Sequence, residues 1–277
     1  MIIVQLVGGL GNQLFQYAAG YALSKKNNKV LKFDRSVYTT YRLHNFALGN
    51  LRIEASEASN DEIELLSNSG KTFLERGLEY DERFNQPFDR CIMKGYWQSE
   101  RYFADFRSQL LSQFRPIADS DDPRDRATND SIDNHISVAV HIRRADYVTD
   151  QNANAVHGVL SSNYYKEARD LILNKLNRNQ RDSAHWFIFS DDPTWVKDNL
   201  TWFGPMTVIE HNGPERNYRD IELMSKCRHH IIANSSFSWW GAWLSTHRDQ
   251  IVIAPRRWFA DTCLQSKDIV PSRWIKL

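Results

Sequence analysis

Two arginines and two serines in the second half of the chain have the residue types and positions of an anion-binding site. Arg143 and Arg144 directly follow the apolar run 136–142, which is typical of a buried central strand, and Ser235 and Ser236 begin a helical pattern. A guanidinium can hold two phosphate oxygens at once, and the N–H groups at a helix start bind anions. The pattern predicts a diphosphate site. A surface ion pair at the arginines and ordinary capping at the serines are the alternatives.

Two aspartates could complete such a site. Asp146 follows the arginines closely and could be the base that takes a proton from an acceptor, or it could orient Arg143 or Arg144 through an ion pair. Asp220 lies in the first turn of the helix predicted over 217–227. Its carboxylate could accept two N–H donors of a guanine ring, or it could be a favourable charge at the helix start. These residues together indicate a pocket for a nucleoside diphosphate.

A metal-dependent alternative depends on the pair Asp119 and Asp121. Their spacing resembles the paired carboxylates with which metal-dependent sugar transferases hold a nucleotide-bound cation. No predicted strand precedes the pair, and it lies among other polar loop residues. We therefore expect no metal site in this chain.

The elements that position these residues begin with a β-α-β unit. An apolar strand runs into a turn containing Gly9 and Gly11, a helix follows with Asn12 as its expected N-cap, and a second strand covers 30–33. The turn resembles the start of a dinucleotide-binding fingerprint, but Leu14 occupies the place of its third glycine. The turn therefore favours close approach of some ligand other than NAD.

The remaining pattern alternates strands and helices, which is typical of α/β domains with parallel sheets. The first half predicts helices over 57–67 and 71–76, a strand over 91–97 and a helix over 100–114. The polar stretch 116–134 that follows is predicted to be an interdomain linker or a surface excursion. After the central strand, the second half predicts helices over 163–176, 194–200 with Asp192 as cap, 217–227 and from 234, with strands over 185–189, 206–209 and 230–233. We expect domains at 1–134 (with its linker) and 135–277, and the chain end could pack back on the first.

Composition limits the class of protein. The formal net charge of +1 gives no electrostatic reason to expect nucleic-acid binding. The chain has three widely spaced cysteines, which predict buried thiols in a reducing compartment. No apolar run approaches the roughly 18 residues of a transmembrane helix, and a strand at the very start leaves no room for a signal peptide. We therefore expect a cytoplasmic protein.

Five motifs stand in the order found in bacterial alpha-1,2-fucosyltransferases, and the chain resembles that family over almost its whole length. They are Gly8-Gly-Leu-Gly-Asn-Gln-Leu-Phe-Gln-Tyr-Ala18, Gly95-Tyr-Trp-Gln98, Val140-His-Ile-Arg-Arg-Ala-Asp-Tyr147, Phe189-Ser-Asp-Asp-Pro193 and Asn234-Ser-Ser-Phe-Ser-Trp-Trp-Gly241. The resemblance implies two Rossmann-like domains facing across a cleft (GT-B type), with GDP-fucose as the donor and no metal or other cofactor.

The resemblance also implies roles for individual residues. Arg143 would hold the β-phosphate of GDP, His141 would lie along the nucleotide, and Asp220 would bind guanine. The phosphate-binding helix start would match Ser235, Ser236 and Phe237. The residues that would face the fucose from the other domain are Gly9, Gly11 and Asn12.

The expected reaction is transfer of fucose, with inversion, from GDP to a hydroxyl of a galactose-containing glycan. The candidate catalytic residues are Arg143, Asn12 and, as a base, Asp146. The acceptor could be lipid-linked, as in O-antigen biosynthesis, which would place the enzyme peripherally at the inner membrane. A nicotinamide-dependent oxidoreductase and a non-catalytic sugar-binding module are the alternatives.

Overall fold

The computed structural model describes residues 1–264 and 266–277, with the side chains of all of these except Ala145 and Asp146. The chain divides into two compact units. The first contains Met1–Ile117 and residues 266–271, and the second contains Ala118–Leu264 and Ser272–Leu277. The first unit therefore ends before residue 134, where the sequence pattern places the boundary.

The stretch 116–134, predicted as a linker or surface excursion, contains the division between the two units and also a helix. An α-helix, α4 (Pro123–Asp133), occupies it, with Asp122 as N-cap and Pro123 in the first turn. Although α4 is mostly polar, Asp125, Thr128 and Ile132 are buried. The helix packs against α10 in the second unit, so its few buried contacts are tertiary.

The first unit is built on a five-stranded parallel sheet with the order β3-β2-β1-β5-β4. The strands are β1 (Ile2–Gln5), β2 (Leu31–Asp34), β3 (Ser56–Glu57), β4 (Thr72–Leu74) and β5 (Cys91–Lys94). The helices are α1 (Leu10–Lys26), α2 (Asn60–Asn68) and α3 (Arg107–Gln113), with 3-10 turns η1 (Ser36–Thr39), η2 (Leu48–Asn50), η3 (Glu82–Asn85), η4 (Glu100–Tyr102) and η5 (Ala104–Phe106).

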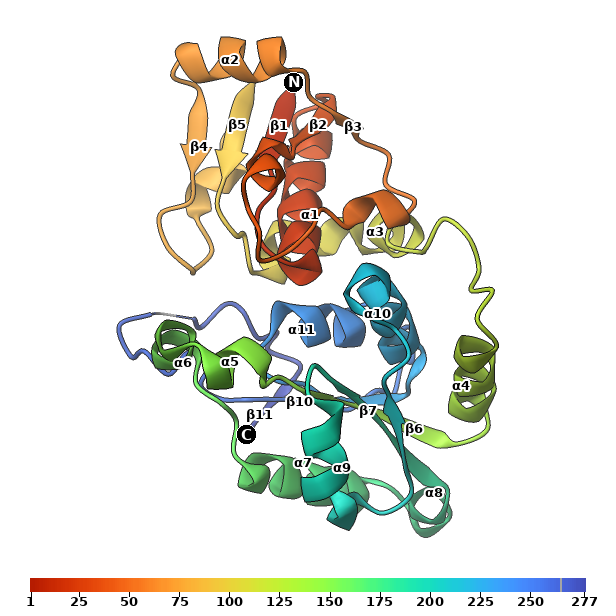
Figure 1. Cartoon of the computed structure of the whole chain (residues 1–277). Coiled ribbons are helices and arrows are strands. Elements are labelled where there is room, and N and C mark those ends of the chain that lie inside the picture. Colours follow the sequence, from red (N-terminus) through yellow and green to blue (C-terminus); the bar gives the residue numbers. More distant parts are fainter. Residues whose placement is uncertain (265) are drawn as a thin grey trace. The chain divides into compact units, whose positions relative to one another are not determined.

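Helices α1 and α2 cover opposite faces of this sheet (Figure 1). A Cβ on Gly20 of α1 would lie 3.0 Å from Val4 Cβ, so this glycine lets α1 pack closely on β1. The neighbouring residue Ile3 points the other way and packs with Leu66 of α2 and with Ile92. In a dinucleotide-binding fingerprint the third glycine lets the helix pack closely on the strand. Here Gly20 does so, about two turns after Leu14, which occupies the place of that glycine.

Two element predictions in the first unit are wrong. Residues 71–76 do not form a helix, because Phe73 is buried between two exposed neighbours in β4, and β4 pairs with β5. The helix predicted over 100–114 is broken into η4, η5 and α3. Tyr102 is buried there, and its Oη accepts a hydrogen bond from the Asp81 N–H at 2.8 Å, a tertiary contact that helical periodicity does not anticipate.

The second unit is built on a six-stranded parallel sheet with the order β8-β7-β6-β9-β10-β11. The strands are β6 (Ile136–Ile142), β7 (Ala184–Ser190), β8 (Met206–Ile209), β9 (His229–Ile231), β10 (Val252–Ala254) and β11 (Ile275–Lys276). Besides α4, the helices are α5 (Ala145–Thr149), α6 (Gln151–His157), α7 (Ser162–Lys175), α8 (Arg178–Asp182), α9 (Pro193–Asn199), α10 (Asn217–Lys226) and α11 (Ser236–Trp243), with η6 (Thr201–Phe203) and η7 (Pro214–Arg216). The fold is therefore α/β with two parallel sheets, as the sequence predicts.

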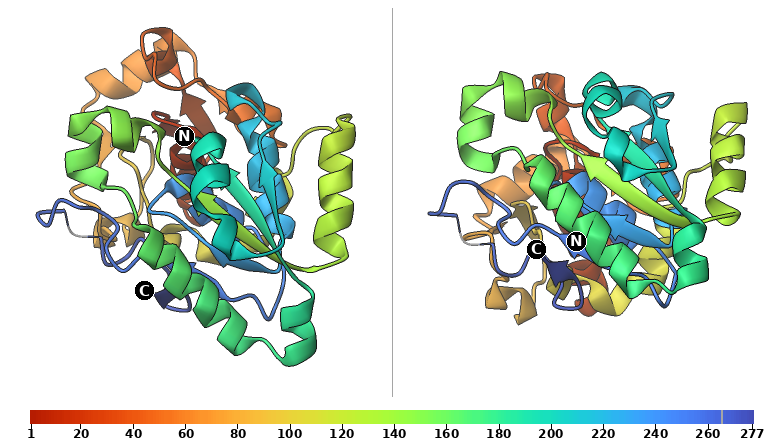
Figure 2. Two further views of the ribbon diagram at one scale, coloured as in Figure 1. Left: turned by 60° about the horizontal axis from the view of Figure 1, so that its bottom comes forward. Right: turned by 90° about the horizontal axis from the view of Figure 1, so that it is seen from below.

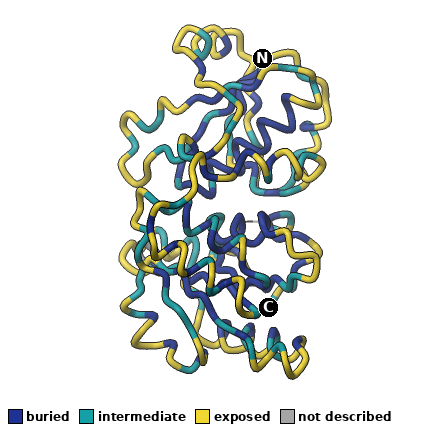
Figure 3. Tube along the Cα trace, turned by 90° about the vertical axis from the view of Figure 1, so that its right-hand side faces the viewer, coloured by how far each residue is buried: buried dark blue, intermediate teal, exposed yellow. Residues whose placement is uncertain are grey.

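The pleat of β6 sends alternate side chains to the two faces of the second sheet. Val138, Val140 and Ile142 pack in a core with α7 and α9, while the ring of His141 lies against Phe237 of α11. Figures 1 and 2 show the helices on the two sides of this sheet. Both faces are covered, which explains why the run reads as continuously apolar. Figure 3 shows buried stretches of chain through the centre of each unit.

Candidate active site

The second sheet has a topological switch point between β6 and β9. From β6 the chain proceeds to β7 and β8 on one side, and then returns to β9, β10 and β11 on the other. In open α/β sheets ligands bind outside the carboxyl ends of the strands at such a point. Arg143 directly follows β6, and the loop after β9 leads into α11. The structure thus places two sequence-predicted groups on either side of the switch point.

The two arginines are held by the acidic pair that follows β7. Arg143 Nη1 lies 2.7 Å from Asp191 Oδ2, and Arg144 Nε lies 3.2 Å from Asp192 Oδ2. The Arg144 N–H also donates to Asp191 Oδ1 at 2.8 Å, and its guanidinium stacks on Trp195 at 3.9 Å. The motifs around Arg143 and Asp191 are therefore in direct contact. The sequence predicted a helix-capping role for Asp192 and no role for Asp191.

Ion pairs do exist at these arginines, as one alternative predicted, and the described acids are Asp191 and Asp192, which follow β7. Asp146 was expected either as their partner or as a base. It belongs to α5, and its side chain lies outside the described residues. The hypothesis that it is a base therefore stays a prediction. Arg143 and Arg144 keep only a quarter or less of their side chains exposed, which fits a braced site rather than a loose surface pair.

His141 is a buried, neutral imidazole beside the start of α11. It is 5% exposed, and burial together with the charge of Arg143 lowers its pKa to about 3. Its ring lies 5.6 Å from the ring of Phe237, and its backbone carbonyl accepts a hydrogen bond from Tyr165 Oη. No described residue hydrogen-bonds to its Nδ1. A buried polar atom without a protein partner is well suited to a ligand.

The start of α11 is shaped by its cap and by a buried asparagine. Ser235 is the N-cap, and its Oγ accepts the Phe237 N–H at 3.3 Å. Asn234 is buried and donates to the carbonyls of His157 and Trp258, which fixes the loop before the helix. Ser236 is the first helical residue. Capping of α11 by Ser235 is therefore observed, and it does not conflict with anion binding by the helix N–H groups.

Asp220 lies in the first turn of α10, as predicted, and α10 packs against α11. Its Oδ1 accepts a hydrogen bond from Asn212 Nδ2 at 2.9 Å, and no described residue donates to Oδ2. Burial raises its pKa to about 7, and the charge of Asp125 adds to the rise. A perturbed carboxyl at a sheet edge is a candidate binding group.

In the first unit, the glycine turn after β1 is tied to the neighbouring loops by buried glutamines. Gln13 donates to the carbonyls of Gly8 and Asn45, and Gln16 donates to the carbonyl of Gly95. Gly8 has a φ of 83°, and a Cβ there would lie 2.7 Å from the Asn12 side chain. The glutamines of the first motif therefore hold the turn in shape.

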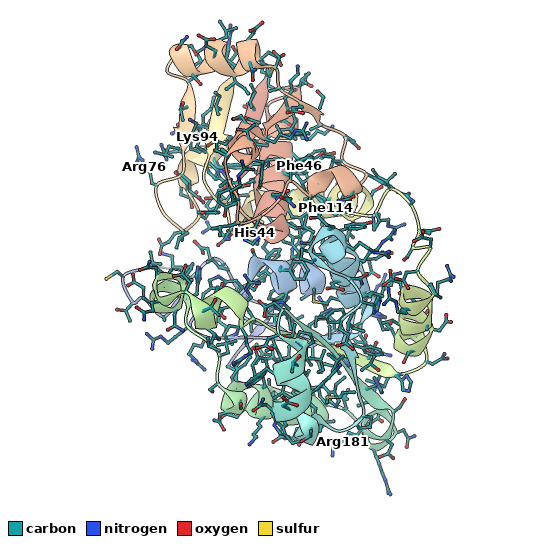
Figure 4. The ribbon with its side chains drawn as sticks, viewed as in Figure 1. His44, Phe46, Arg76, Lys94, Phe114 and Arg181 are labelled. Atoms are coloured by element: carbon teal, nitrogen blue, oxygen red, sulfur yellow. The ribbon has the colours of Figure 1, made fainter. Side chains whose placement is uncertain are left out.

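The predicted N-cap role of Asn12 is wrong, because α1 begins two residues earlier with Gly9 as its cap. Asn12 instead accepts a hydrogen bond on Oδ1 from Gln98 Nε2 at 2.8 Å. This bond joins the first family motif to the second. Gly9 lies beside His44, which Figure 4 labels on the loop after β2, and Gly11 is in the first turn of α1. Neither Gln98 nor His44 had a role assigned from sequence.

The side chain of Asp121 is fully exposed, and that of Asp119 is exposed as well. Among the residues that the structure describes, no group of three or more histidine, cysteine, aspartate or glutamate side chains could hold a metal ion. No helix in the described ranges is long and apolar enough to cross a bilayer. The Asp119/Asp121 pair lies in the segment before α4.

Comparison with known proteins places the whole chain in one family. The family described as "Glycosyl transferase family 11" matches residues 1–277. An alpha-1,2-colitosyltransferase of Escherichia coli is 35% identical, with 100% of this chain and 99% of that protein covered. The O-antigen biosynthesis glycosyltransferase WbnK of Escherichia coli is 29% identical, with 98% and 99% covered. Galactoside alpha-(1,2)-fucosyltransferase 2 of Bos taurus is 25% identical, with 88% and 69% covered.

The fold is also similar to that of a solved plant enzyme. A mutant of Arabidopsis thaliana FUT1 in complex with GDP superposes with a TM-score of 0.52 at 10% identity, over 91% of this chain and 70% of that chain. At this identity the likeness concerns the fold alone.

Proposed function

We propose that this chain, which belongs to glycosyl transferase family 11, moves L-fucose from GDP-fucose to a galactose hydroxyl of a glycan. The product would be an alpha-1,2 linkage formed with inversion and without a metal ion. The observation that carries the proposal is that Arg143 and the start of α11 follow the neighbouring strands β6 and β9, on the two sides of the switch point of the second sheet. Anion-binding groups there suit the diphosphate of a sugar nucleotide.

The chemistry requires stabilisation of negative charge on departing GDP. Breaking the bond between the sugar and the phosphate leaves charge on the β-phosphate, while positive charge develops on the sugar ring. Arg143, braced by Asp191, can present a fixed guanidinium, and the N-terminus of α11 adds partial positive charge. His141 and Phe237 would contact the nucleotide, with Asp220 accepting hydrogen bonds from guanine.

The acceptor hydroxyl must lose a proton during transfer. Asp146 remains the candidate base, and Gly9, Gly11 and Asn12 remain candidates for contact with the sugar at the edge of the first sheet. The hydrogen bond from Gln98 Nε2 to Asn12 Oδ1 holds the amide of Asn12 beside the glycine turn, where it would contact the sugar.

A second candidate donor is GDP-colitose, because the relative at 35% identity is named as a colitosyltransferase. Colitose is L-fucose without its 3-hydroxyl group, so the two donors would share the GDP site and differ at a single contact. A site that hydrogen-bonds the 3-hydroxyl rejects the deoxy sugar strongly, whereas an apolar contact there discriminates weakly.

The acceptor is proposed to be a galactose-containing oligosaccharide that could be lipid-linked. Support comes from one relative named for O-antigen biosynthesis and another named for galactosides. Such an acceptor would be met at the inner membrane face, which fits a cytoplasmic or peripheral enzyme.

The experiment offers the purified chain GDP-fucose and GDP-colitose with a panel of β-galactosides, followed by linkage analysis of each product. We expect an alpha-1,2-fucosylated galactoside. Transfer of colitose alone would replace the donor in this proposal. GDP binding without any transfer would leave a nucleotide-binding protein and contradict the proposed reaction.

A further inference from the structure

Asp125 is a buried carboxylate of α4 that accepts hydrogen bonds from three separate segments. It is 1% exposed. Its Oδ1 accepts from His211 Nε2 at 2.8 Å and from Asn212 Nδ2 at 3.1 Å, and its Oδ2 accepts from Ser120 Oγ at 2.5 Å and Arg216 Nη2 at 3.0 Å. Buried carboxylates persist only when they are well satisfied, and this one is.

The same asparagine amide that donates to Asp125 also donates to Asp220. Asn212 Nδ2 lies 3.1 Å from Asp125 Oδ1 and 2.9 Å from Asp220 Oδ1. The two N–H bonds of one planar amide thus link two carboxylates, which sets the rotation of the amide and leaves one orientation for it. Oδ1 of Asn212 is buried without a described partner, so the contacts of this amide with the two carboxylates are made by its N–H donors.

This arrangement holds one oxygen of Asp220 in place and leaves the other without a described donor. Guanine presents two adjacent N–H donors, on N1 and on the 2-amino group, and both need an acceptor fixed in the plane of the base. A carboxylate that rotates would lose one of the two bonds. We propose that Asp125, acting through Asn212, is a positioning residue that fixes the Asp220 carboxylate for guanine. The inference rests on the proposed function, because it assumes that Asp220 binds the base.

Asn212 and Asp125 shift the pKa of Asp220 in opposite directions. Burial is the main reason that the pKa of Asp220 is about 7; the Asn212 hydrogen bond lowers it, and the charge of Asp125 raises it. Burial alone would raise the pKa of Asp125, but the hydrogen bonds from Ser120, Asn212 and His211 hold it below its usual value. Asp125 is therefore charged when Asp220 titrates.

Other charges near α10 are largely paired among themselves. Arg124 pairs with Asp122 at 2.8 Å, and Arg219 pairs with Glu222 at 2.8 Å. The remaining ionisable groups on α4, on η7, on α10 and in the loop before η7 are Asp125, Arg126, Asp130, Asp133, Glu210 (which pairs with Lys197), His211, Glu215, Arg216, Tyr218 and Lys226, and α11 carries none. The described charge that acts on Asp220 is that of Asp125.

The test measures the affinity of the full chain for GDP and for IDP by calorimetry from pH 6 to 8.5. IDP lacks the 2-amino group and has the same diphosphate, so the ratio of the two affinities reports on the base alone. We expect the parent to prefer GDP by about tenfold or more once Asp220 is ionised, since one lost hydrogen bond of about 1.4 kcal/mol is a factor of ten.

Asn212→Ala should reduce this preference to less than about threefold and move the midpoint of its pH dependence upward, because the bond that favours the Asp220 carboxylate is lost. Asp125→Asn should reduce the preference as well, yet move the midpoint downward, because a repelling charge is removed. Asp130→Asn, an exposed aspartate on the same helix, should behave as the parent. A purely structural role would weaken GDP and IDP equally and leave both midpoints unchanged, which would overturn the proposal.

Asn212→Ala keeps three partners on Asp125, so it should fold even where Asp125→Asn does not. Asp220→Asn in the same titrations separates the guanine contact of Asp220 from the positioning role of Asp125 and Asn212. If it leaves the preference for GDP intact, the assignment of Asp220 to guanine is wrong. If it abolishes the preference while Asn212→Ala retains it at every pH, Asp220 binds the base and the positioning role is wrong.

Discussion

At the scale of single residues, Arg143 differs from Arg144 in what surrounds it. Arg144 has a backbone bond to Asp191, an ion pair with Asp192 and a stack on Trp195. These contacts suit a residue that braces the loop. Arg143 pairs with Asp191 at the carboxyl end of β6, next to the switch point. A guanidinium carries five N–H donors, so this pairing is compatible with binding a phosphate.

Arg143→Lys should therefore lower turnover by about 10²–10³-fold, roughly 3–4 kcal/mol, although the charge is kept. Lysine cannot hold Asp191 and two phosphate oxygens in one plane. Arg144→Lys is the matched control and should lose less turnover while melting earlier. Steady-state kinetics with melting curves give both values. Parent-like turnover in Arg143→Lys would show that no bidentate contact exists, and early melting of both variants alone would favour a structural ion pair.

At the scale of elements, the contact between α10 and α11 depends on one glycine. A Cβ on Gly241 of α11 would lie 2.7 Å from the Cβ of Met224 on α10, so neither side chain could rotate away from the clash. This close packing brings the helix that carries Asp220 against the helix that begins with the serine motif. The close packing of α10 on α11 therefore explains why the fifth motif ends in glycine, at Gly241.

Gly241→Ala should destabilise the protein by about 1–3 kcal/mol through overpacking and should also weaken GDP binding, because α10 shifts away from α11. Urea unfolding and calorimetry with GDP measure the two effects. Gly213→Ala is the control, since nothing lies within 4 Å of its added Cβ. If Gly241→Ala proves as stable as Gly213→Ala, the two helices are not held at this distance.

At the scale of the whole molecule, the second unit supplies positive charge to the proposed diphosphate site through its own groups. Arg143 and the start of α11 lie on the two sides of the switch point, whereas Asp119 and Asp121 are exposed in the segment before α4. We expect transfer to persist in excess chelator at the parent rate. Loss of activity that added magnesium or manganese restores would contradict metal independence and revive the paired-carboxylate hypothesis.

The sequence by itself determined the class of fold and the strands that carry the site. Continuous apolar runs marked β6 as covered on both faces, and the strand-helix alternation of the second half was confirmed because its elements are regular and have local stop and start signals. Asp192 caps α9 as predicted, a contact made within three residues. Such features depend on short stretches of chain, so periodicity and cap chemistry find them.

Only the tertiary structure decided which side chains meet. The pairs Arg143–Asp191, Asn12–Gln98 and Asp125–Asn212 join segments far apart in the sequence, and no local pattern distinguishes their members from surface residues. Asp125 was assigned to a linker because the polar composition around it outweighed its few buried positions. A buried carboxylate is identified by the donors around it, and those donors gather only when distant elements pack together.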